Sequence, residues 1–110
     1  MGLDAWIVAV KDNERRRLLD WRGYREINSH IGNLFYLQHP ELRDDPEDPF
    51  NGGITILTKE DLVELLQLIM DDEFDVDFYS DADRSQTLAK LRNALKMAKD
   101  GYTIQYLCSY

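Results

Sequence analysis

Carboxylates are the side chains of this sequence that could do the most chemistry, and they gather in two blocks. The first block is PELRDDPEDPFNGG (Pro40–Gly53) and the second is DDEFDVDFYSDAD (Asp71–Asp83). Dense carboxylates can bind a divalent cation, act in pairs as acid and base, or replace phosphates against a basic protein surface. The residues around each block distinguish these uses.

The second block lacks the pattern of a calcium-binding loop. An EF-hand loop starting at Asp71 needs glycine at position 76 and glutamate at position 82, where this chain has Val76 and Ala82. Alternation of apolar residues with aspartates over 74–78 instead predicts an edge strand with a charged outer face. Cation binding and contact with a basic partner remain alternatives for this block.

No motif for covalent or cofactor chemistry is present. His30 and His39 lack the spacing and the cysteine pair of a zinc site, and neither a phosphate-binding loop nor a nucleophile elbow occurs. Cys108 lies in an apolar and aromatic segment without a nearby base, which predicts a buried structural thiol. We therefore predict no cofactor, no metal and no enzymatic activity, with a small carboxylate or divalent-cation enzyme as the alternative.

The charge of the chain is negative but uneven. The 110 residues carry a formal charge of -8, and 44% are hydrophobic, which predicts one globular domain over 1–110. The net charge is +1 over 1–40, -13 over 41–83 and +4 over 84–110. The excess of negative charge argues against general binding to nucleic acid or to anionic membranes. The uneven distribution makes the molecule dipolar, which favours steered encounter with a charged partner or head-to-tail self-association, such as a homodimer.

Targeting signals are not evident either. The longest apolar run, Ala5 to Val10, is far shorter than the roughly 20 residues that cross a bilayer, and it lacks the flanks of a secretory signal. Cys108 is the single cysteine, in keeping with a reducing compartment. We therefore expect a cytoplasmic protein.

Hydropathy patterns predict the elements that position the two blocks. We expect strands over 4–10, 54–57 and 102–110, a short helical turn over 13–21 capped by Asn13, and helices over 24–38, 59–70 and 85–99. In the short turn, Arg15 to Arg17 are expected to face water. This order of elements predicts an α+β fold with a small, mainly antiparallel sheet and three to four packed helices.

Four segments of the chain resemble a group of small uncharacterised phage and prophage proteins that begin Met-Gly-Leu-Asp. The segments are MGLDAWI, WRGYREINSHIGNLF, TKEDLVELL and YTIQYLCSY, whereas Ala5 and Tyr110 differ from the Met and Trp typical of that group. The resemblance implies an α+β fold and a phage context, hence the cytoplasm of a bacterial host cell. It implies no catalytic residues.

Together these observations favour a binding protein. We expect an anti-defence inhibitor, for example of a CRISPR effector, that occupies a basic surface of a nucleic-acid-handling enzyme or complex without contacting nucleic acid. An immunity protein or antitoxin against a toxic nuclease is the alternative with the same kind of contact. The expected contact residues are the carboxylates and two apolar anchors of the blocks: Asp44, Asp45, Glu47, Asp48, Phe50, Asp71, Asp72, Phe74, Asp75, Asp77, Asp81 and Asp83.

Overall fold

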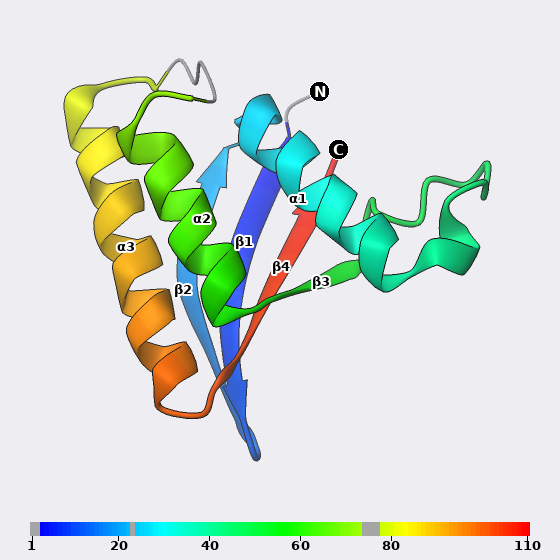
Figure 1. The fold of residues 1–110 in the computed structure, drawn as a ribbon, viewed down its shortest axis with the longest axis horizontal. Helices are drawn as coiled ribbons and strands as arrows, with labels where there is room; N and C mark the ends of the chain where they lie inside the picture. The colour runs from blue at the N-terminus through cyan, green and yellow to red at the C-terminus, as the bar shows by residue number, and fades with distance from the viewer. Residues whose placement is uncertain (1–2, 23, 74–77) are drawn as a thin grey trace.

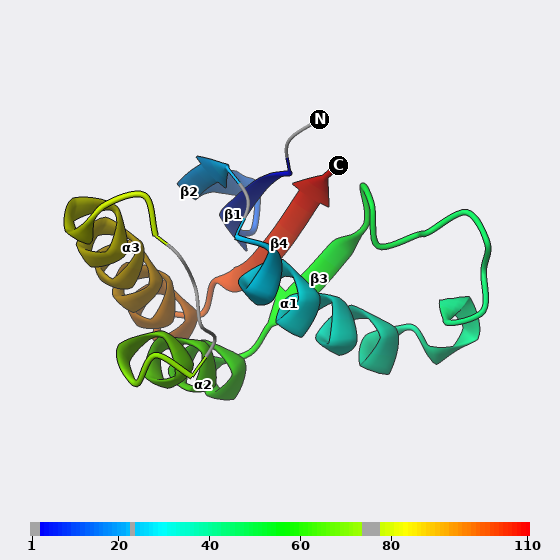
Figure 2. The same ribbon diagram turned by 90° about the horizontal axis from the view of Figure 1, so that it is seen from above.

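The protein consists of one antiparallel sheet covered on one side by three helices (Figures 1 and 2). The computed structural model describes residues 3–22, 24–73 and 78–110, and for 21–22 it describes the backbone alone. Its elements are β1 (Asp4–Lys11), β2 (Glu14–Arg22), α1 (Arg25–Gln38), a short 3-10 helix (Pro40–Leu42), β3 (Ile54–Leu57), α2 (Lys59–Met70), α3 (Asp81–Lys99) and β4 (Thr103–Ser109). The predicted α+β class and antiparallel sheet are confirmed.

Alternation along the strands decides which side chains enter the core. The strands are ordered β2-β1-β4-β3, and each pair of neighbours is antiparallel. Ala5, Ile7 and Ala9 of β1 are fully buried under the helices. From β4, Ile104, Tyr106 and Cys108 join the same core, as the period of two predicted.

The helical turn predicted over 13–21 is wrong, because this segment forms β2. Asp12 and Asn13 make a two-residue turn in which Asp12 has a φ of 53°, and β2 then pairs back along β1. A bulge opposite Ile7 and Val8 accommodates the adjacent leucines Leu18 and Leu19 in one strand. Pairing with β1 is a tertiary interaction, so the local pattern of the segment did not indicate it.

The helix termini follow local capping signals. The Thr58 hydroxyl accepts a hydrogen bond from the Asp61 amide at 3.1 Å, and the Asp61 carboxylate accepts one from the Thr58 amide at 2.9 Å, which forms a capping box at the start of α2. Ser80 caps α3 in a similar way through the Asp83 amide. Helix α3 therefore begins at Asp81, earlier than the predicted Ser85. None of the described helices is long and apolar enough to span a membrane.

Candidate functional site

The two acidic blocks lie at opposite ends of α1 (Figure 1). The N-cap residue of α1, Tyr24, packs its ring 4.7 Å from Phe78 and 5.8 Å from Tyr79, which belong to the second block. The first block, here called the acidic loop (Pro40–Gly53), follows the other end of the helix. A helix of 14 residues is about 21 Å long. The described carboxylates of the two blocks are therefore presented separately.

The acidic loop is anchored in the core by Phe50. This side chain is only 5% exposed, and its ring lies 5.5 Å from that of Phe35 and is stacked at 6.3 Å on that of Tyr106. It also packs against Gly32, where an added Cβ would come within 3.2 Å of the ring. Phe50, which the sequence suggested as an apolar anchor for a partner, therefore packs in the core of this protein, where its ring holds the loop.

The segment after β4 holds the loop from a second side. The Asn51 side chain exchanges two hydrogen bonds with the backbone of Tyr110, at 3.0 and 3.1 Å. The Tyr110 hydroxyl donates to Asp48 at 2.6 Å, and the Tyr36 hydroxyl donates to the other Asp48 oxygen at 3.4 Å. Burial and the hydrogen bond to Asp48 raise the pKa of Tyr110, so the phenol stays protonated and keeps donating. Both oxygens of the Asp48 carboxylate therefore accept hydrogen bonds from within the protein.

Three other carboxylates of the loop are exposed to solvent. Asp44, Asp45 and Glu47 are exposed, and within the described part of the chain no cation lies within 4 Å of them. Asp45 accepts a hydrogen bond from the Glu47 amide at 2.9 Å, which shapes the local turn. The acidic loop therefore presents three exposed carboxylates, none of them ion-paired with a described residue, on a braced backbone.

Three described carboxylates of the second block, Asp72, Asp81 and Asp83, have local roles. The Arg84 guanidinium donates to the carbonyls of Ile69 and Met70 and lies 3.7 Å from a carboxylate oxygen of Asp72. Asp71 is the C-cap of α2, while Asp81 and Asp83 lie in the first turn of α3, where the helix dipole favours negative charge. Phe74, Asp75 and Asp77, and most of the edge strand predicted there, fall outside the described residues.

The bracing residues Tyr36, Asn51 and Tyr110 were not predicted. Tyr110 directly follows β4, and its partner Asp48 is 62 residues away in sequence. No local sequence pattern indicates a contact between two residues that far apart in the chain.

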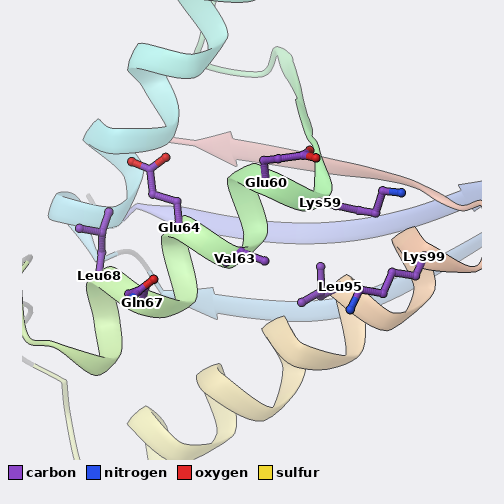
Figure 3. Close-up of a pocket in the computed structure, with 8 residues that line it drawn as sticks. All are labelled: Lys59, Glu60, Val63, Glu64, Gln67, Leu68, Leu95 and Lys99. Atoms are coloured by element: carbon purple, nitrogen blue, oxygen red, sulfur yellow. The ribbon is translucent and has the colours of Figure 1, made fainter.

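A groove lies elsewhere, along α2 and beside α3 (Figure 3). It has a volume of about 420 Å³, and its apolar lining comes from Val63, Leu68 and Leu95. Lys59 and Lys99 lie at one end, while Glu64 extends from α2 towards α1 and Glu60 lies near the start of α2. The lining of this groove holds no Cys, His or Ser, and it offers apolar and charged contacts. Among the described residues, no cluster of three or more His, Cys, Asp or Glu could hold a metal ion.

Cys108 is buried, and its thiol donates to the Phe50 carbonyl at 3.5 Å. Burial raises the pKa of this thiol to about 11, so the reactive thiolate is scarce near neutral pH. We expect no reaction of the folded protein with a disulfide reagent at about pH 8, and full reaction in denaturant, where the pKa returns towards 8.5. Spectroscopic thiol titration measures both. Rapid native labelling would contradict the burial of this thiol.

The fold and the site define a two-layer α+β protein that carries a braced acidic loop beside β3. The chain matches no family model, no curated protein and no solved structure. Its function therefore has to be argued from the site itself.

Proposed function

We propose that this protein is a phage-type inhibitor that binds a basic surface of a nucleic-acid-handling enzyme or complex through the acidic loop. One observation carries the proposal: Asp44, Asp45 and Glu47 are exposed without a cation in range, on a loop held by Phe50 and Tyr110. The carboxylates would take the positions of phosphates against Lys and Arg of the partner. The resemblance to phage proteins supports an anti-defence role.

The bracing of the loop strengthens this assignment. A flexible acidic segment loses conformational freedom when it binds, and that cost weakens the complex. Burial of Phe50 and the contacts of Asp48 order the loop before a partner arrives. The same contact would serve an immunity protein against a toxic nuclease, and the identity of the captured partner distinguishes the two roles.

Two triple variants test which block makes the contact. Asp44→Asn, Asp45→Asn and Glu47→Gln neutralise the acidic loop, whereas Asp71→Asn, Asp72→Asn and Glu73→Gln neutralise the exposed turn after α2. Each variant removes three negative charges, so the change in net charge is matched. We expect the loop variant to slow association with the partner at least about tenfold and the turn variant to act far less.

The measurement begins with capture of the partner from a bacterial lysate, followed by mass spectrometry. Association rates are then measured with the purified partner at low salt and at about 0.5 M salt, where charge steering is screened. An equal effect of the two variants would exclude the acidic loop as the specific contact. A complex that is unchanged at high salt and in both variants would exclude charge mimicry.

A further inference from the structure

The sheet has a second face, here called the open sheet face, that none of the described helices covers (Figure 2). The register places side chains of β1, β4 and β3 side by side on it: Trp6 is paired with Leu107, Leu107 with Ile54, and Val8 with Gln105. The apolar members of this face are Trp6, Val8, Val10, Ile54, Ile56 and Leu107. They form an apolar stripe across three strands.

This stripe is partly shielded from water by its own neighbours. Val8 is only 2% exposed although no helix lies over it, and the Arg17 guanidinium lies 5.7 Å from the centroid of the Trp6 ring. Ile54 and Ile56, on the β3 side, remain 41% and 36% exposed. Covering these side chains would remove apolar surface from water, which favours association.

The charges on the open sheet face nearly balance, although the whole molecule is strongly acidic. The charged side chains described there are Asp4, Arg15, Arg17 and Asp20, and the register adds Arg22 opposite Asp4, which leaves one positive charge in excess. Arg17 pairs with Asp20 at 3.2 Å. The acidic loop lies beyond β3, at the side of the sheet (Figure 2). A strongly basic partner is therefore complementary in charge to the acidic loop. A nearly neutral surface that carries charges of both signs, such as the open sheet face, can be complementary to a copy of itself.

The strand edges, in contrast, are protected. The Gln38 amide donates to the Ile56 carbonyl at 2.7 Å and accepts from the Ile56 amide at 3.0 Å, which occupies the outer edge of β3. On the other edge, β2 carries the bulge and three consecutive arginines, Arg15 to Arg17. Bulges and charges oppose strand addition at an edge. Association is therefore directed to the face of the sheet.

We propose that the open sheet face binds the same face of a second copy of this chain, forming a two-fold symmetric dimer. Three strands of about seven residues and the four residues of β3, at ~3.4 Å per residue and ~4.8 Å between strands, outline a face of roughly 400 Å² per copy. The total of about 800 Å² is well below a standard interface, so we expect a weak dimer with a dissociation constant of about 10–100 µM. The acidic loop of each copy stays free, and the dimer presents two loops to a partner.

Analytical ultracentrifugation of the full chain over about 5–500 µM tests the dimer. We expect Ile54→Lys to raise the dissociation constant at least about tenfold, because it places a charge in the apolar stripe. Val63→Lys is the matched control, since Val63 is 46% exposed on α2 and the added charge is the same. Ile56→Gln provides a second variant of similar volume, and thermal melts verify that each variant folds.

A wild-type chain that stays monomeric at the highest concentration would overturn the proposal, and so would equal effects of Ile54→Lys and Val63→Lys. The triple loop variant should leave the dissociation constant of the dimer nearly unchanged. The dimer and the function of the acidic loop can therefore fail independently.

Discussion

Replacement of Phe50 by alanine is expected to lower the free energy of unfolding by about 3–5 kcal/mol, the usual cost of removing a buried phenylalanine. The ring is 5% exposed and packs on Gly32, Phe35 and Tyr106, so its loss leaves a cavity between α1, the loop and β4. A domain of this size has only about 5–15 kcal/mol of stability in total. Phe50→Ala should therefore also free the acidic loop from the core.

Chemical denaturation and amide hydrogen exchange check both parts of this expectation. Exchange should accelerate in residues 43–53, while α2 keeps its protection under conditions where the variant is folded. Leu37→Ala is the control, because Leu37 is 68% exposed on α1 and its truncation should change stability by less than about 0.5 kcal/mol. Similar losses in the two variants would show that Phe50 does not hold the loop.

Gly53→Ala should be the most damaging glycine substitution in the loop. A Cβ at Gly53 would lie 2.5 Å from the Pro49 carbonyl oxygen and 2.9 Å from the Phe35 ring, so the backbone of the loop has to move. We expect a loss of about 3 kcal/mol in the free energy of unfolding, the upper part of the usual range for overpacking. The moved loop would also present Asp44, Asp45 and Glu47 in a different arrangement.

The neighbouring glycine separates this steric effect from backbone strain. Gly52 has a φ of +83°, but nothing lies within 4 Å of the position of an added Cβ. Gly52→Ala should therefore cost only about 1–2 kcal/mol, the penalty of a left-handed conformation for an L-residue. Denaturant melts of the two variants give the comparison. A larger loss for Gly52→Ala would mean that strain, and not the contact with Pro49, limits the loop.

Much of the fold could be predicted because its signals are local. The cap at Thr58 and the leucine stripe of α2 act within a few residues of each other, so the helix follows from the segment alone. The alternation over β4 likewise placed Tyr106 and Cys108 in the core. β2 was missed because its structure depends on pairing with β1. Two adjacent leucines also break the alternation expected of a strand, and only the bulge accommodates them.

The candidate site was predicted only in part. The sequence identified the acidic loop as a long exposed segment and Asp44, Asp45 and Glu47 as its carboxylates, and the structure describes all three as exposed. From the sequence we also expected Asp48 to contact the partner. In the fold its carboxylate accepts hydrogen bonds from the hydroxyls of Tyr36 and Tyr110. A carboxylate has the same sequence signal whether it faces water or a tyrosine from a distant segment of the chain.

By itself, then, the sequence determined where along the chain the negative charge lies, because residue type sets the charge. It also determined the helix over 59–70, because its cap and apolar stripe depend on neighbouring residues. Tertiary structure decided that the two acidic blocks lie at opposite ends of α1 and that one sheet face stays uncovered. It also decided that Phe50 enters the core, through contact with Tyr106, 56 residues away in sequence. The physical reason is that such contacts form only after distant segments pack together, and no local spacing records that packing.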